Sequence, residues 1–208
     1  TVKSFTIERA NHPISITAAS VTYTGAAYSE TNITVTPTCE VTFTYYASET
    51  STDPIAHPTD VGKYWVVASY AGTDNYNSST SARVSFSITK ATPPTPAEVK
   101  VDGEDKTLKD LEDSMRKDLG AIEGEFTWRD SDGKELDKNT KIEANKEYEW
   151  TFTPTGKDAK NYRPIYGKTT PYVRDDLSWL PGVLGGGSSF SFHDVTRFDY
   201  YYDSVKWA

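Results

Sequence analysis

The stretch "DVGKYWVVASY", residues 60–70, decides the fold that the sequence predicts for the first half of the chain. Tyr64, Val66 and Ala68 fall on one side of its backbone and Trp65 on the other, which is the two-residue period of a half-buried strand. The Asp-x-Gly-x-Tyr pattern at its start is typical of a tyrosine corner, in which the hydroxyl bonds back to the backbone of the turn. The stretch therefore predicts a strand of an antiparallel β-sandwich.

Four other runs between residues 14 and 91 alternate in the same way and are rich in β-branched and aromatic residues. They are "ISITAASVTYTG" at 14–25, "ITVTPT" at 33–38, "EVTFTYYAS" at 40–48 and "ARVSFSITKA" at 82–91. Short strands at this spacing, with turn residues between them and no helical period, predict an all-β sandwich.

The charge distribution divides the chain into two modules. Only 12 side chains of residues 1–91 are charged, whereas 32 of residues 92–172 are. Residues 92–98, "TPPTPAE", form a stiff linker because the three prolines fix φ and remove amide donors. The net charge of −8 includes no basic cluster, so nucleic acid is not an expected partner. No apolar run approaches the ~18 residues of a membrane span, so no membrane insertion is expected.

Three segments of residues 13–91 resemble bacterial immunoglobulin-like repeats of the MBG type. They are "VTYTGAAYS" at 21–29, "DVGKYWVVASYAGTDNYN" at 60–77 and "FSITKA" at 86–91. The resemblance implies an immunoglobulin-like sandwich that recurs in tandem on secreted bacterial proteins. The run "SFTIERA" at residues 4–10 nearly repeats the closing run, so residues 1–12 are expected to be the tail of a preceding repeat.

Residues 99–174 are predicted to be a divergent copy of the first module. In order along the chain, "EGEFTWRDS", "ANKEYEWTF" and "KNY" parallel "EVTFTYYAS", "DVGKYWVV" and "DNY". The run at 140–162 also resembles a segment common in repeat regions of Gram-positive surface proteins. Because Lys146 replaces the glycine of the first corner, the pattern does not predict a second tyrosine corner at Tyr148.

The second module also contains a helix that the first lacks. Leu108, Leu111, Met115 and Leu119 lie at helical spacing, which predicts one helix at about residues 108–119. Thr107 is the expected N-cap, and Gly120 the expected residue after the helix. A short stripe of this kind is typical of a helix that covers a sheet rather than of a groove for a partner.

The C-terminal part departs from both modules. Residues 175–189, which include "GVLGGGSS", have the composition of a flexible linker. The run "FSFHDVTRFDYYYDSVKWA" at 190–208 resembles the start of an S-layer homology domain. That family anchors proteins to secondary cell-wall polymers, and this chain carries only the first third or so of such a domain. The resemblance implies that the parent protein, not this segment, binds wall polymer.

Most candidate chemical sites have a simpler structural interpretation. Cys39, the single cysteine, is expected to be packed and inert, since His12, His57 and His193 lie in no recognisable catalytic motif. The corner accounts for Asp60 without an acid site.

Two acidic features have structural interpretations as well. The acidic run "RDSDGKELD" at 129–137 fails the EF-hand pattern and predicts a hairpin turn at Asp132-Gly133. The pairs Glu123 with Glu125 and Glu147 with Glu149 are interpreted as solvated strand faces. No metal and no cofactor are expected.

Exposed aromatic residues keep a binding function open. Fourteen Tyr and five Trp residues could include a platform on which sugars stack, and Trp65 is the single candidate residue. A further alternative is an intramolecular isopeptide bond between a Lys and an Asn or Asp, which is known in Gram-positive immunoglobulin-like domains. The sequence does not show which two residues would form it.

The sequence thus predicts two tandem immunoglobulin-like β-sandwiches, the second with one inserted helix. The expected function is a nonenzymatic spacer in a secreted protein of the bacterial cell surface or S-layer, whose partners are the neighbouring modules of the same parent. Glycan or cell-wall polymer would be bound through the parent. The alternative is an adhesin or carbohydrate-binding module that uses exposed aromatic residues.

Overall fold

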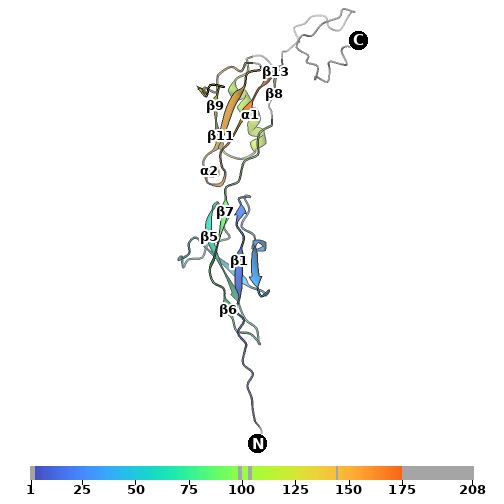
Figure 1. Ribbon diagram of the computed structural model, residues 1–208, viewed down its shortest axis with the longest axis vertical. Helices are drawn as coiled ribbons and strands as arrows, with labels where there is room; N and C mark the ends of the chain where they lie inside the picture. The colour runs from blue at the N-terminus through green and yellow to red at the C-terminus, as the bar shows by residue number, and fades with distance from the viewer. Residues whose placement is uncertain (1–2, 98–99, 103–104, 144, 175–208) are drawn as a thin grey trace, which may run out of the picture. The chain divides into compact units, whose positions relative to one another are not determined.

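A computed structural model describes residues 3–97, 100–102, 105–143 and 145–174 of the 208-residue chain. In the first module the predicted strand at residues 60–70 is β5 (Gly62–Tyr70), which lies inside the larger sheet (Figure 1). The strand order of that sheet is β2-β7-β5-β4, and β6 also pairs with β5. The other strands are β2 (Val21–Thr22), β4 (Thr42–Tyr46), β6 (Ser79–Thr80) and β7 (Val84–Thr89).

A smaller sheet completes the first module. It pairs β1 (Ser15–Ala18) with β3 (Ile33–Thr36), which a 3-10 turn at Glu30–Asn32 precedes. Ile16 and Ile33 of this sheet share one buried cluster with Val66 and Phe86 of the larger sheet. The two sheets therefore enclose a common apolar core, as predicted.

The predicted run at residues 14–25 divides between the two sheets. It bends after β1, where the Ala19 amide donates to the Asn32 carbonyl, and continues as β2. The Ser20 hydroxyl accepts a hydrogen bond from the Ser87 amide at 3.0 Å. Alternation alone did not reveal this change of sheet, because the residues on both sides of the bend keep strand character.

The predicted tyrosine corner is confirmed at Tyr64. Its hydroxyl donates a hydrogen bond to the Asp60 carbonyl oxygen at 2.9 Å. A Cβ at Gly62 would lie 3.0 Å from the Tyr64 ring, so the glycine gives the ring room to fold back over the turn. The corner fixes the entry of the chain into β5.

The second module contains one four-stranded antiparallel sheet in the order β10-β9-β11-β12. A separate parallel pair joins β8 (Lys100–Asp102) to β13 (Tyr172–Arg174). A short helix, α2 (Asp158–Asn161), follows β11. The sheet strands are β9 (Gly124–Arg129), β10 (Glu135–Leu136), β11 (Tyr148–Pro154) and β12 (Ile165–Thr169).

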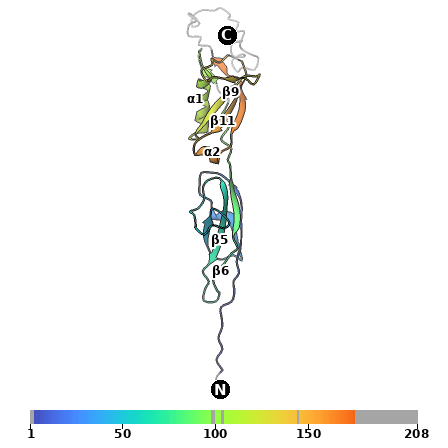
Figure 2. The same ribbon diagram turned by 90° about the vertical axis from the view of Figure 1, so that its left-hand side faces the viewer.

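The predicted helix is present as α1 (Leu108–Leu119) and lies along the sheet in both views (Figures 1 and 2). At its start the Asp110 carboxylate accepts hydrogen bonds from the amide and the hydroxyl of Thr107, both at 2.8 Å. Both bonds lower the pKa of Asp110, and the bond from the amide has the larger effect. The predicted apolar stripe is buried in one cluster with Trp128, Trp150 and Phe152. The core of the second module thus lies between the sheet and α1.

The two modules share the register of one pair of neighbouring strands. Tyr45 of β4 stands opposite Val66 of β5, and Trp128 of β9 stands opposite Trp150 of β11. These four positions correspond in the sequence alignment of the modules. The shared register supports the interpretation of one repeated architecture.

A second backbone-bonded tyrosine occurs where the sequence did not predict one. The Tyr148 hydroxyl accepts a hydrogen bond from the Glu143 amide at 3.0 Å, whereas Tyr64 donates to a carbonyl. Asn145, with φ of 61°, supplies the tight turn, because asparagine tolerates the left-handed region better than most residues. Lys146 places its ammonium 5.8 Å from the centre of the Tyr148 ring instead of blocking it.

Two sequence predictions lie outside the described residues, namely the flexible linker at 175–189 and the S-layer homology start at 190–208. In the part of the chain that the structure describes, no helix is both long and apolar enough to cross a membrane.

Candidate functional site

Trp65, the glycan-stacking candidate, lies on the outer face of the larger sheet of the first module. It stands opposite Tyr46 on β4 and Ser85 on β7. The Lys63 ammonium lies 5.0 Å from the centre of its half-buried ring. A stacking sugar would have to displace this cation from the ring.

The neighbouring ring of Tyr46 is covered in the same way. The Arg83 guanidinium lies 3.8 Å from the ring centre, and it also donates hydrogen bonds to the carbonyl oxygens of Ser48, Glu49 and Ser51. Arg83 therefore holds the loop after β4 against the sheet. The outer aromatic residues of the first module make structural cation–π contacts and do not form a bare platform.

The second module presents an exposed ring that the sequence analysis did not single out. Tyr166 on β12 is 83% exposed and stands opposite Thr151 on β11. It borders a shallow groove of ≈ 470 Å³, which Arg129, Glu149 and Lys168 also line. A ring beside charged groups and hydroxyls is an arrangement that sugars use. The sequence carried one indication of it, since Tyr166 alternates with the buried Ile165.

Three of the four carboxylates in the predicted acidic pairs contact lysines, those of Glu123, Glu147 and Glu149. Glu147 and Glu149 both contact the Lys168 ammonium, at 2.8 and 3.1 Å, and these bonds raise the pKa of Lys168. Glu123 lies 3.9 Å from the Lys157 ammonium. Carboxylates engaged in this way are not the free acid and base that proton transfer requires.

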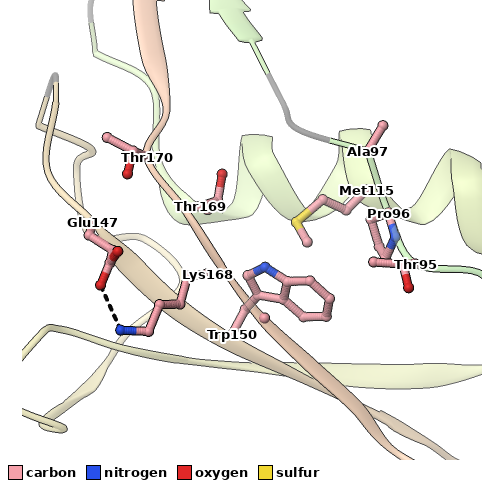
Figure 3. A pocket seen from close by; sticks show the side chains of 10 residues that line it. Thr95, Pro96, Ala97, Met115, Glu147, Trp150, Lys168, Thr169 and Thr170 are labelled. Carbon is pink, nitrogen blue, oxygen red and sulfur yellow. Dashed lines mark hydrogen bonds and ion pairs between the residues drawn. The ribbon is translucent and has the colours of Figure 1, made fainter.

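A cavity of ≈ 320 Å³ is lined by residues of the linker, α1 and the end of β12, whose side chains Figure 3 shows. The Trp150 indole faces Met115 of α1 and Pro96 of the linker across it. The Thr169 hydroxyl, also on its wall, is buried without a hydrogen-bond partner among the described residues. Of the described residues that line it, Glu147 and Lys168 are charged, and they pair with each other at 2.8 Å.

Tyr45 of the first core lies next to the half-exposed side chains of His57 and Glu30. The rings of Tyr45 and His57 lie 4.7 Å apart, and His57 Nε2 lies 3.7 Å from the Glu30 carboxylate. Burial, with a smaller effect of the Glu30 charge, raises the pKa of Tyr45 to about 12. The phenol therefore stays protonated at neutral pH and acts as a core residue, not as a base.

The other candidate positions have structural roles. Cys39 is half-buried and packs against the core of the first module, and the His12 ring packs against Tyr70 and Tyr76. The predicted turn at Asp132-Gly133 is confirmed, with Gly133 at φ of 79°. Among the described residues, no three His, Cys, Asp or Glu side chains gather as a metal site would require.

Each module pairs its last strand in parallel with an early one. In the first module β7 pairs with β2, so that Val21 stands opposite Ile88, and the Tyr23 amide donates to the Thr89 carbonyl at 2.9 Å. In the second module β13 pairs with β8. When the chain is pulled from both ends, the two strands of such a parallel pair are drawn in opposite directions along their length. Their hydrogen bonds are then loaded together instead of opening one at a time.

A set of hydrogen bonds, called here the joint, connects the end of the first module to the second. The Ala91 amide donates to the Asn161 carbonyl, and the Arg163 amide donates to the Ala91 carbonyl, both at 3.0 Å. The Asn161 side chain accepts from the Val61 amide at 2.9 Å and donates to the Asp60 carboxylate at 3.0 Å. The tyrosine corner of the first module is thereby bound to α2 of the second.

Two further contacts complete the joint. Lys160 lies 3.3 Å from the Asp60 carboxylate, and the rings of Tyr23 and Tyr162 meet edge to face at 5.3 Å. Asn161 is only 5% exposed, so its side-chain amide is removed from water. Its hydrogen bonds to Val61 and Asp60 replace those it would make to water. The sequence analysis noted "KNY" only as a repeated motif, and its contact with Asp60 needs the tertiary structure.

The joint is expected to weaken in acid. The hydrogen bond from Asn161, and then that from Lys160, lower the pKa of Asp60 below its ordinary value of 3.8. A lowered pKa in the folded state means that the contact is fully present above pH 3.8 and is lost as the pH falls through the lower folded value. In an NMR titration of carboxyl groups, Asn161→Ala should move the Asp60 pKa back towards 3.8, while Asn139→Ala, in an exposed turn, should not. An unchanged Asp60 titration in Asn161→Ala would contradict this assignment.

Comparison with known proteins does not assign the chain to a family. No protein-family model matches the sequence, and no curated protein matches it either.

Proposed function

We propose that the chain is a nonenzymatic spacer in a secreted protein of the bacterial cell surface. The first module would be an immunoglobulin-like β-sandwich and the second a divergent copy of it, in which α1 covers the main sheet, leading into a wall-anchoring region. The resemblance to MBG repeats and to the start of an S-layer homology domain supports this location. In such a protein the spacer holds a more distal domain away from the wall.

The parallel pairing of the last strand of each module with an early strand carries this proposal. Both modules have it, between β2 and β7 and between β8 and β13, although the rest of their architecture differs. A spacer is loaded through its chain ends, and this pairing puts the terminal hydrogen bonds in shear. The hydrogen-bonded joint at Asn161 adds a second resistance, because it ties the corner of the first module to the second.

Single-molecule pulling of the full chain by its ends tests the spacer function. Tyr23→Pro removes the amide that donates to Thr89 and is expected to lower the unfolding force of the first module while leaving that of the second unchanged. The matched variant Tyr23→Ala removes the ring, with its contacts to Tyr162 and the core, but keeps the amide, so the unfolding force of the first module should fall less than in Tyr23→Pro. If proline and alanine had the same effect, the strand pair would not be the element that bears the force.

The groove beside Tyr166 supports a second candidate function, binding of a glycan. It combines an 83% exposed ring with the Arg129, Glu149 and Lys168 side chains. A spacer predicts no saturable binding when the chain is screened against glycans and wall polysaccharides. Binding that is lost in Tyr166→Ala but kept in Trp65→Ala would replace the spacer by a carbohydrate-binding module centred on β12, and the reverse pattern would place the site on the first module.

A further inference from the structure

The arm formed by residues 4–10 exposes two apolar side chains that its sequence marks as core residues. Phe5 and Ile7 are each 85% exposed, and among the described residues only Ala10, at the end of the arm, is bridged to another segment. Their counterparts in the similar run at 85–91 are Phe86 and Ile88, which are 2% and 3% exposed on β7. The arm therefore has the same alternation of apolar residues as β7, but its apolar side chains are exposed whereas those of β7 are buried.

The end of the arm binds the first module as the end of β7 binds the second. The Ala10 amide donates to the Asn75 carbonyl, and the Asn77 amide donates to the Ala10 carbonyl, both at 2.9 Å. Ala91 makes the same two bonds with Asn161 and Arg163. Both alanines form a parallel bridge to the tyrosine of an Asn-Tyr pair. Half of the joint is thus repeated at residues 75–77.

The other half of that joint is open. Asn161 binds the corner residues Asp60 and Val61 through its side chain, whereas Asn75 is exposed and its side chain makes no hydrogen bond to any described residue. Tyr162 meets the Tyr23 ring, whereas its counterpart Tyr76 packs against His12 of its own module and is 42% exposed. The contacts missing at residues 75–77 are therefore the counterparts of those that the corner and the Tyr23 ring of the first module make at the joint.

We propose that the arm and residues 75–77 form a docking surface for a further immunoglobulin-like sandwich. This sandwich takes residues 4–8 as its last strand, buries Phe5 and Ile7 in its core, and places its corner loop on Asn75 and an aromatic ring on Tyr76. The inference rests on the proposed spacer function, because a tandem array is what reuses one set of contacts at both ends of a module.

Charge at the surface restricts the corner loop of the partner. Lys160 attracts Asp60 at the observed joint, but the corresponding position before Asn75 is Asp74. An aspartate in the corner loop would face a like charge there, which is unfavourable. The partner therefore presents a neutral or basic side chain opposite Asp74, with a hydrogen-bond acceptor for the Asn75 amide.

The test is a chain in which a copy of residues 11–84, carrying Asp60→Asn, is joined directly before Ser4 of the full chain. Residues 4–10 then stand where β7 begins in the added copy. Hydrogen exchange at residues 5–8 is expected to slow by about a hundredfold or more relative to the original chain, because a paired strand opens with its module. A control chain carries "SFSITKA" in place of "SFTIERA".

Residual dipolar couplings measure whether the added copy is docked on the first module. If the added copy is docked, it and the first module are expected to share one alignment. Asn75→Ala is expected to give them different alignments. Asn139→Ala, in an exposed turn of the second module, is expected to leave the alignments unchanged. Restoring aspartate at position 60 of the copy should weaken docking, and Asp74→Lys should recover it.

Three results would overturn the proposal. The arm stays unprotected although the control chain folds; neither chain completes the added copy; or the strand forms and Asn75→Ala changes no coupling. None of these readouts measures force or glycan binding. Exchange and dipolar-coupling results against docking would therefore not contradict the spacer proposal. Pulling results against the spacer would likewise not contradict the docking surface.

Discussion

Phe86→Ala is expected to lower the free energy of unfolding of the first module by about 3–5 kcal/mol. The Phe86 ring is 2% exposed and stacks on Tyr28 with ring centres 3.9 Å apart, while Tyr45 and Tyr64 contact it from other directions. Alanine would leave a cavity between rings that cannot close over it. Native-state hydrogen exchange of the β5 and β7 amides measures the loss in this module separately from the second.

Phe5→Ala is the matched control, since the two phenylalanines occupy the same place in similar runs. Because Phe5 is 85% exposed, its removal should change the stability of the chain by less than about 0.5 kcal/mol. A large loss in Phe5→Ala would show that the arm already packs against the chain, and a small loss in Phe86→Ala would contradict the shared core of the two sheets.

Leu111→Ala is expected to destabilise the second module by about 2–5 kcal/mol. Leu111 is fully buried and lies in one cluster with Trp128, Trp150 and Phe152 of the sheet. With only one main sheet in this module, α1 supplies the opposite wall of the core. Faster hydrogen exchange throughout β9 and β11 would report the loss.

Lys117→Ala is the control on the exposed side of the same helix. It removes a long side chain from α1 without changing the core, so its effect should stay within about 0.5 kcal/mol. If both variants lost the same small amount, α1 would be a peripheral addition and the sheet would be stable without it.

The order and character of the elements were predictable wherever local chemistry decides them. Alternation located β3, β4, β5 and β7, because a half-buried strand must place apolar residues at every second position. The spacing of Leu108, Leu111, Met115 and Leu119 gave the bounds of α1, since four apolar residues at helical spacing need a common apolar face. The corner at Tyr64 followed from Gly62, whose missing side chain makes room for the ring.

Contacts between distant segments were not predictable, because the pattern of a strand does not state what covers each face. Trp65 and Tyr166 both point outward by alternation, yet Lys63 covers the first ring and the second is exposed. The backbone bond of Tyr148 depends on the left-handed turn at Asn145, which the missing glycine concealed.

By itself the sequence indicated a β-rich chain with the helix α1 in its second half, since composition and periodicity act over a few neighbouring residues, but it did not predict the short helix α2. The tertiary structure alone decided that α1 and a single sheet enclose the second core, that terminal strands pair in parallel, and that Asn161 binds the corner at Asp60. These features join residues as many as 101 positions apart, and only the folded chain brings such residues within the reach of a hydrogen bond.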